Sequence, residues 1–493
     1  TGTAVPAFAD VYDIRKGSIT IVANGDGTAK VTQNETVNDK DDDVKVTGSN
    51  EVTGNTVDII NNTDNDLKVT LSDVTITDPK GDAAPVSVSG TGNTAIELDG
   101  SNTLKSSGWH AGLERNEEKN SDGNVVSGKL TIQDEDKNGS LDATGGFGGA
   151  GIGGANIKNS GVLEITGGTI TATGKQDGAG IGGGGTQGSG KVTIKNGNVT
   201  AKTNSLAAAI GGGNGGSGDV TILDGRVTTQ LVNKNDPVTG IGGAPNSTDK
   251  STVRILGGVV DAVGNRYGSG IGGGSGDAQG AEVEIGGGAQ VTAKGGKEGT
   301  YAGKTYGAGA AIGTSGGAGG IAGKEQDVNA SGEGTVTRVD PNLPADHKHE
   351  WTLVSSTPAA VGQQGEKVYE CSCGSTRTEY ESALPTPAPV EEQNGRNAYA
   401  ALTVEGAAYE MHQESARCIV TADSDIATLF GSLGNLAELK AQGVDTLVFR
   451  TKSRETALDI DAMLPLGAED TLFTLTHSGS SATLTVGGAD HSE

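Results

Sequence analysis

Residues 178–184 read Gly-Ala-Gly-Ile-Gly-Gly-Gly, and residues 191–194 read Lys-Val-Thr-Ile. Variants of the first stretch recur along the middle of the chain, each centred on an isoleucine with glycine or alanine beside it. The interval is about 30 residues, and one longer interval contains an insertion from Lys294 to Tyr306. Such a period indicates stacked structural repeats. The central isoleucines are Ile152, Ile181, Ile210, Ile241, Ile271 and Ile312.

Each period also contains two runs with strand spacing. In Val192-Thr193-Ile194 and again in Val199-Thr200-Ala201, apolar residues stand two apart with a polar residue between them. Asn196-Gly197 lies between the runs and suits a tight turn with positive φ. Three short strands per period predict one coil of a parallel β-helix, which we place at residues 10–340. A second inward column is expected at Ile165, Ile194, Ile222, Ile255 and Ile285.

The two ends of the chain differ from the repeats. Residues 1–9 end in Ala7-Phe8-Ala9, a small-x-small pattern that predicts the remnant of a secretory signal peptide. Residues 341–383 form a small segment with His-x-His and Cys-x-Cys, and 384–396 are a proline-rich linker. Residues 397–493 predict an α+β domain with a helix from Ile426 to Gln442. Its strands are expected at Thr446–Phe449, Thr471–Leu475 and Thr483–Val486.

Composition excludes several classes of partner. The chain has 493 residues and a net charge of −26, and no basic stripe is visible, so nucleic acid is excluded as a partner. No apolar run of about 18 residues is present, so membrane insertion is not expected. With three cysteines in all, disulfides do not hold this fold together.

The repeated Gly-Ala-Gly-Ile-Gly-Gly-Gly coil with its Lys-Val-Thr-Ile companion strand resembles the glycine-rich, right-handed parallel β-helix domains of carbohydrate-binding type in secreted surface proteins of Gram-positive bacteria. The segment from His347 to Glu379 is similar to a small His/Cys module of such proteins. The resemblance covers about two thirds of the chain. It implies a right-handed coil, an extracellular location and a non-catalytic role in binding glycan or in adhesion.

Four aromatic residues precede the inward column by four to six residues and therefore share one turn of the coil. They are Trp109, Phe147, Tyr267 and Tyr306. Sugar rings stack on exposed aromatic planes, so two pairs about four coils apart would form a glycan-binding ridge. The alternative is that these rings cover the apolar ladder at loop insertions.

Two patterns could bind metal ions. One pattern matches the start of a calcium-binding loop and comprises Asp134, Asp136, Asn138 and Asp142. The twelfth position, which is glutamate in such loops, is Gly145, and the flanking sequence predicts strands rather than helices. His347, His349, Cys371 and Cys373 could present two imidazoles and two thiolates from neighbouring strands to a zinc ion. The alternatives are a polar insertion loop for the first, and a Cys371–Cys373 disulfide or no site for the second.

The sequence shows no recognisable catalytic constellation. The outward residues of one strand column include Glu164, Arg254 and Glu284, one per coil, and the two glutamates would be four coils apart. We therefore expect a secreted or cell-surface, non-catalytic protein that recognises polysaccharide along the β-helix. The alternatives are a structural or adhesive stalk with a host or cell-surface protein as partner, and a polysaccharide lyase or glycoside hydrolase.

Overall fold

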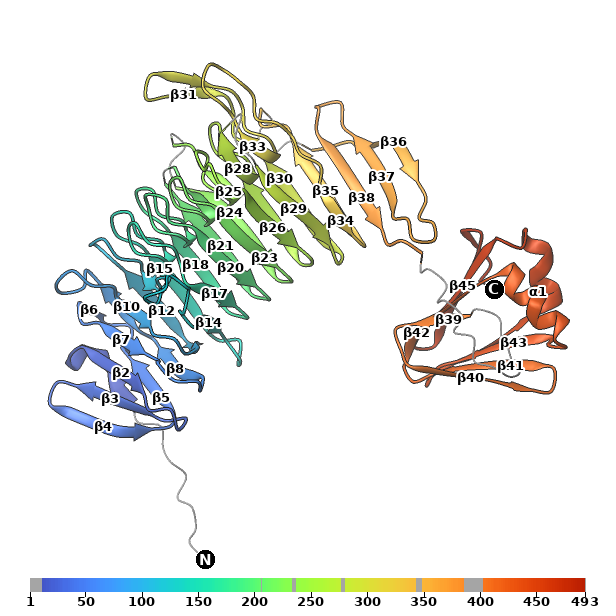
Figure 1. Cartoon of the computed structure of the whole chain (residues 1–493), viewed down its shortest axis with the longest axis horizontal. Coiled ribbons are helices and arrows are strands. Elements are labelled where there is room, and N and C mark those ends of the chain that lie inside the picture. The colour runs from blue at the N-terminus through green and yellow to red at the C-terminus, as the bar shows by residue number, and fades with distance from the viewer. Residues whose placement is uncertain are drawn as a thin grey trace, which may run out of the picture. The chain divides into compact units, whose positions relative to one another are not determined.

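A computed structural model describes residues 11–204, 206–232, 236–275, 280–342, 348–384 and 402–492 (Figure 1). The chain falls into two compact units that divide after Leu384. The predicted signal remnant, His347 and all of the linker after Leu384 lie outside the described residues.

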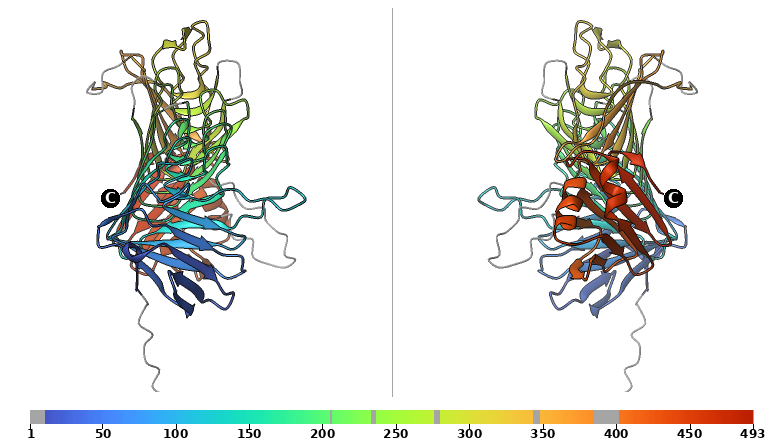
Figure 2. Two further views of the ribbon diagram at one scale, coloured as in Figure 1. Left: turned by 90° about the vertical axis from the view of Figure 1, so that its left-hand side faces the viewer. Right: turned by 90° about the vertical axis from the view of Figure 1, so that its right-hand side faces the viewer.

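The first unit is a parallel β-helix with three sheets, as the repeats predicted. In one coil, β17 (Val162–Ile165) is followed by β18 (Thr169–Thr173) and β19 (Ile181–Gly182). Each pairs in parallel with its equivalent in the next coil: β20 (Gly190–Ile194), β21 (Asn198–Thr203) and β22 (Ala208–Gly211). Figure 1 shows the equivalent strands of successive coils side by side, and Figure 2 shows the same coils from two further sides.

The three sheets have 11, 12 and 13 strands. Sheet 1 also contains β1 (Val11–Asp13), β5 (Val44–Thr47), β8 (Leu67–Ser72), β11 (Thr94–Asp99), β14 (Lys129–Gln133), β23 (Gly218–Ile222), β26 (Ser251–Ile255), β29 (Ala281–Gly286) and β34 (Asn329–Ser331). Sheet 2 also contains β2 (Ile19–Ala23), β3 (Ala29–Gln33), β4 (Thr36–Asp41), β7 (Val57–Ile60), β10 (Val86–Ser89), β13 (Leu113–Glu114), β16 (Ile152–Gly153), β25 (Thr239–Gly242), β28 (Ile271–Ser275) and β33 (Ile312–Ser315). Sheet 3 also contains β6 (Val52–Thr53), β9 (Thr75–Thr77), β12 (Ser101–Lys105), β15 (Ser140–Thr144), β24 (Arg226–Leu231), β27 (Val259–Val263), β30 (Ala289–Lys294), β35 (Gly334–Val339), β36 (Thr352–Thr357), β37 (Gly365–Glu370) and β38 (Thr376–Glu381).

The core consists of columns of identical or similar side chains. Ile181 of β19 lies beside Ile210 of β22, and Ile165 of β17 lies beside Ile194 of β20. Every isoleucine that the repeats placed in the two inward columns is fully buried. The predicted core is therefore confirmed, and it stabilises the stack because each buried aliphatic side chain contributes about 1.5–3 kcal/mol.

A glycine directly after the inward isoleucine of the sheet 2 strands lets the chain turn sharply. Gly182 has a φ of +133°, and a Cβ placed there would lie 2.0 Å from the carbonyl oxygen of Gly211 in the next coil. Gly153, Gly211 and Gly242 have the same conformation and an equally close neighbour. These glycines therefore allow the close approach of successive coils.

Replacement of this glycine should destabilise the stack. We expect Gly182→Ala to lower the free energy of unfolding by about 1–3 kcal/mol, because the new methyl group meets backbone atoms and the φ is unfavourable for alanine. Denaturant unfolding measures the change. Gly299→Ala is the matched control, since nothing lies within 4 Å of its Cβ position. An equal loss in both variants would contradict the argument.

Antiparallel strands extend one sheet at each end of the solenoid. At the N-terminal end, β3 pairs with β2 and β4 pairs with β3, extending sheet 2 after the short helix η1 (Ile14–Lys16). At the other end, β38 pairs with β35, and β37 and β36 follow it, extending sheet 3. Most of the small His/Cys segment is thus a three-stranded cap on sheet 3, within the same compact unit.

Arg115 holds a long insertion against the coil. The insertion runs from residue 116 to 127, between β13 and β14. The fully buried guanidinium donates hydrogen bonds to the carbonyl oxygens of Val88, Gly90 and Gly128 and forms an ion pair of 3.0 Å with Glu118. Burial lowers the pKa of Arg115, although Glu118 opposes the shift. These three carbonyl groups belong to two coils. Arg115 therefore ties the start of the insertion to the neighbouring coil.

The second unit combines two sheets and short helices. One sheet has the order β39 (Thr403–Glu405), β42 (Ile426–Ser432), β45 (Leu472–Ser478), β46 (Ser481–Val486) and β47 (Ala489–Asp490). The other has β40 (Tyr409–Glu414), β41 (Arg417–Ala422), β43 (Thr446–Arg450) and β44 (Glu455–Asp459). The helices are α1 (Leu433–Ala441), α2 (Ile460–Met463) and η2 (Leu464–Leu466). The three predicted strands correspond to β43, β45 and β46.

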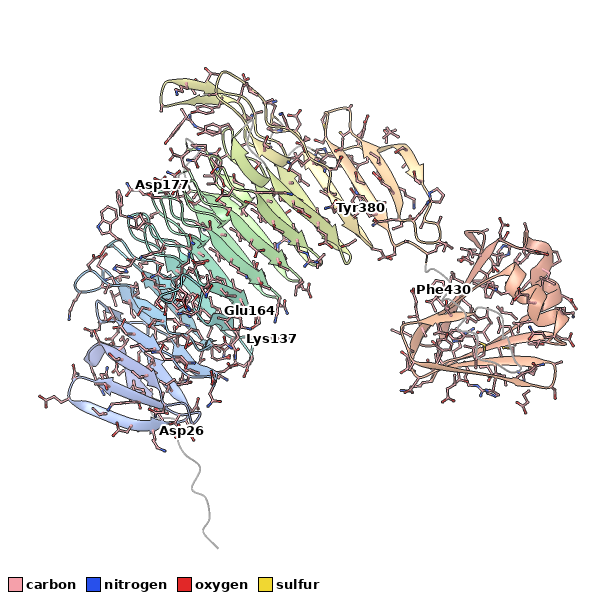
Figure 3. All side chains as sticks on the ribbon, viewed as in Figure 1. Asp26, Lys137, Glu164, Asp177, Tyr380 and Phe430 are labelled. Carbon is pink, nitrogen blue, oxygen red and sulfur yellow. The ribbon has the colours of Figure 1, made fainter. Side chains whose placement is uncertain are left out.

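The predicted helix from Ile426 to Gln442 is wrong in its first part. Residues 426–432 form β42, whose side chains alternate between buried and less buried positions and which pairs with β45. Phe430, labelled in Figure 3, belongs to this strand. The helix begins only after Ser432, which forms a capping box with Asn435. The spacing of the apolar residues fits the period of a helix as well as that of a strand. Hydrogen bonding to β45 makes this segment a strand.

Candidate binding site

The loops that connect sheet 3 to sheet 2 form one edge of the coils, which we call the aromatic edge. Trp109 lies on the loop between β12 and β13, and Phe147 lies on the equivalent loop one coil later. The two rings meet edge to face, with centroids 4.4 Å apart and an interplanar angle of 65°. Trp109 is 50% exposed and Phe147 is 47% exposed. The pair is therefore an exposed apolar patch that two coils build together.

Backbone hydrogen bonds between the coils fix this pair. The amide of Phe147 donates to the carbonyl oxygen of Gly108 at 2.7 Å, and the amide of Asn156 donates to that of Trp109 at 2.9 Å. The amide of Gly146 donates to the carbonyl oxygen of His110. The backbone that carries the two rings is therefore tied between the coils.

A cluster of polar side chains surrounds His110, the residue that follows Trp109 in the chain. Nδ1 of His110 is 2.7 Å from Oε2 of Glu114, and Nε2 of His110 is 3.5 Å from Oδ1 of Asp82. Asn116 donates a hydrogen bond of 2.8 Å to the other oxygen of Glu114. The hydrogen bond to Glu114 raises the pKa of His110, and partial burial opposes this shift.

Protonated His110 should stabilise the aromatic edge. Its folded pKa is raised above the ordinary value of 6.5, so its contribution is full below pH 6.5 and is lost as the pH rises through the folded pKa. We expect the unfolding midpoint of His110→Gln to fall below that of the wild type near pH 5.5, with the difference shrinking towards about pH 8.5. Thermal unfolding across this range measures it. The exposed His412→Gln is the control, and a difference that grows with pH would contradict the expectation.

The second predicted aromatic pair occupies a different environment. Tyr267 stacks on Tyr306, with centroids 4.0 Å apart and planes 14° apart, and Tyr301 packs edge to face at 6.4 Å. Tyr301 and Tyr306 belong to the hairpin of β31 (Gly299–Tyr301) and β32 (Lys304–Tyr306). Tyr267 is only 4% exposed, and burial raises its pKa. The expectation of an accessible ring at Tyr267 is therefore wrong, because the inserted hairpin covers it.

The predicted calcium loop forms a tight turn between sheets 1 and 3. Oδ1 of Asp134 accepts hydrogen bonds of 3.1 Å from the amides of Asn138 and Gly139, and Asn138 donates to Asp136. Glu97, from the preceding coil, joins Asp134 and Asp136, and one carboxylate oxygen of each lies within 4.8 Å of the others. Burial raises the pKa of Asp134.

Asp142 takes no part in this acidic group. It lies on β15, where it faces Lys105 at 3.5 Å.

The turn that contains Asp134 lies away from the aromatic edge. Figure 3 labels Lys137 of this turn at the opposite side of the coils from Asp177, which belongs to a loop of the aromatic edge. Calcium binding by Asp134, Asp136 and Asn138 stays a prediction.

The predicted zinc ligands meet in the C-terminal cap. His349, Cys371 and Cys373 each place one ligand atom within 4.8 Å of the others. Cys371 and Cys373 are not joined by a disulfide. His347, the fourth predicted ligand, lies outside the described residues.

The outward carboxylates of sheet 1 are ion-paired between coils. Glu164, labelled in Figure 3, lies 2.8 Å from Lys129 and 3.0 Å from Lys195. Burial acts to raise the pKa of Glu164, but the two lysines lower it overall. Arg254 binds Glu284 at 2.6 Å and lowers its pKa. A general acid needs a raised pKa, so neither glutamate is suited to that role.

Sequence reasoning found the aromatic pair but missed its polar neighbours. His110 directly follows Trp109, and Glu114 directly follows the inward Leu113, so both could be placed on the coil from the repeats. Asp82 belongs to the preceding coil, where the repeat pattern is weak, and only the stacking of coils brings it to His110. The same holds for Glu97 beside Asp134.

Comparison with known proteins supports the architecture. A family profile described as a β-helix repeat matches residues 163–185, 192–214 and 253–275. Each match begins in a strand of sheet 1 and ends in or just after the sheet 2 strand of the same coil. The chain is therefore similar to proteins built from β-helix repeats. No curated protein and no solved structure matches it. Among the described residues, no helix is long and apolar enough to cross a bilayer.

Proposed function

We propose that this protein is a secreted or cell-surface, non-catalytic binding protein that recognises polysaccharide at the aromatic edge. The observation that carries the proposal is the half-exposed pair of Trp109 and Phe147, held by hydrogen bonds between two coils. Exposed aromatic rings provide flat apolar faces on which the C–H faces of sugar rings can stack.

The arrangement favours a short ligand-binding site on a long scaffold. Only one of the two aromatic pairs offers exposed ring faces, so contact with a few sugar units is expected at this position rather than along the whole solenoid. His110 directly follows Trp109 in the chain and contacts Asp82, so this edge also has hydrogen-bonding groups for sugar hydroxyls. Aromatic faces for stacking combined with polar side groups suit carbohydrate better than a purely apolar ligand.

Charge favours a neutral polysaccharide. The chain has a net charge of −26, which repels polyanions such as uronic-acid polymers. Stacking and neutral hydrogen bonds respond little to ionic strength. Binding to a neutral polysaccharide should therefore change little between low and physiological salt.

The test compares aromatic variants on a panel of soluble neutral polysaccharides. We expect Trp109→Ala and Phe147→Ala each to weaken binding at least about tenfold, which corresponds to about 1.4 kcal/mol. Affinity electrophoresis identifies the polysaccharide, and calorimetry measures the Kd. Tyr409→Ala, which removes an exposed aromatic ring from the second unit, is the matched control and should bind like the wild type.

The outcomes separate the competing functions. Undiminished binding in both edge variants would place the glycan elsewhere. A wild-type protein that binds no polysaccharide on the panel would favour a stalk that contacts a protein partner. Release of shorter saccharides during incubation would favour a lyase or hydrolase.

A further inference from the structure

The cap on sheet 3 brings together three side chains that bind soft metal ions. In the antiparallel pairing of β36 with β37, Thr352 lies opposite Glu370. The segment before β36 therefore runs beside the segment after β37, and continuing the register places residue 349 beside residue 373. Nδ1 of His349 is 3.3 Å from Sγ of Cys373.

The turn between β37 and β38 brings both thiols to the same place. The amide of Gly374 donates to the carbonyl oxygen of Cys371 at 2.9 Å, and the amide of Cys371 donates to that of Ser375 at 3.0 Å. Gly374 has a φ of +85°, which closes the turn. Ser375 connects this turn to the solenoid. The Oγ of Ser375 accepts a hydrogen bond of 3.1 Å from the amide of Asp340, which is one residue beyond the end of β35.

The histidine is also held in place. The ring of His349 stacks on that of Trp351, with centroids 4.7 Å apart and planes 19° apart. Cys371 is 6% exposed, and His349 and Cys373 are partly buried. The ring stack and the turn thus position the three donors, which are partly or fully sheltered from solvent.

We propose that His349, Cys371 and Cys373 bind one Zn²⁺ ion. Two thiolates and one imidazole form a donor set that is typical of zinc sites. Magnesium and calcium ions prefer oxygen ligands instead. The two thiolate charges neutralise the ion in a partly buried place. These three residues would occupy three of the four positions of a tetrahedral zinc site.

The zinc ion would fasten the edge strand of the cap. β36 is exposed along its whole length and, among the strands of the described residues, is the terminal strand of its sheet, next to β37. The ion links the segment before β36 to the turn after β37, so it ties the start of the edge strand to the body of the cap. Its role is structural, and it is independent of glycan binding at the aromatic edge.

The experiment uses the full chain, stripped with a chelator under reducing conditions and then loaded with Zn²⁺ or Co²⁺. After removal of excess metal, we expect about one zinc ion per chain by elemental analysis. The cobalt form should show a thiolate-to-metal charge-transfer band and the visible spectrum of a tetrahedral site. A reduced chain that retains no zinc and gives no such band would overturn the proposal.

Variants test the ligands separately. Cys371→Ser, Cys373→Ser and His349→Gln should each weaken zinc binding at least about a hundredfold. Cys418→Ala and His412→Gln, both in the second unit, are the matched controls and should keep the affinity of the wild type. Full zinc binding by all three ligand variants would contradict the assignment. If a variant fails to fold, the cobalt spectrum of the wild type still decides.

Hydrogen exchange tests the structural role. Removal of zinc should speed amide exchange in β36 and the preceding segment while leaving β17–β22 unchanged. Equal exchange with and without the metal would show that the ion does not fasten the cap. Intact-mass measurement of the untreated protein detects a Cys371–Cys373 disulfide as the loss of two hydrogens. A disulfide that persists under mild reduction and blocks uptake would also overturn the proposal.

Discussion

Stacking of coils in register is the constraint on which the rest of this structure depends. The parallel strands of the three sheets pair with their equivalents one repeat away, so the backbones of successive coils are hydrogen-bonded at the ordinary strand spacing of about 4.8 Å. This spacing forces like residues into columns, with isoleucine beside isoleucine in the core. It also requires glycine where the chain turns in sheet 2, because a side chain there would meet the next coil. A solenoid of this kind is stabilised coil by coil, through contacts between neighbours.

The same pairing leaves the first and last strands of each sheet without a further coil to pair with. A parallel sheet that simply stopped would present unpaired backbone groups to other chains. At each end, antiparallel strands extend one of the sheets: β3 and β4 continue sheet 2, and β36 to β38 continue sheet 3. The second cap leaves β36 as a new edge. The proposed metal site lies where this edge strand begins, so the zinc ion would reinforce the least supported part of the cap.

Surface chemistry follows from the stacking as well. Outward residues of neighbouring coils lie side by side, and charged ones form pairs such as Lys129 with Glu164 and Arg254 with Glu284. Exposed pairs of this kind contribute at most about 1 kcal/mol each, so their main effect is to neutralise the sheet faces. Distinct chemistry is left to the loops at the edges. Trp109 and His110 lie on such a loop, close to the insertion that the buried Arg115 holds in place.

The repeats in the sequence determined the coil, its length of about 30 residues and the inward columns, because strand period and turn glycines are local signals that recur in each coil. They also placed Trp109 beside Phe147, since equivalent positions of adjacent coils are neighbours. Only the tertiary structure decided that Tyr267 is buried, because the hairpin of β31 and β32 folds over it. Only pairing with β45 made residues 426–432 a strand, since their apolar spacing suits a helix equally well. Glu97 joins Asp134, and Asp82 joins His110, through contacts between coils whose residues are far apart in the chain. Contacts of that kind depend on register and loop path, which local sequence patterns do not specify.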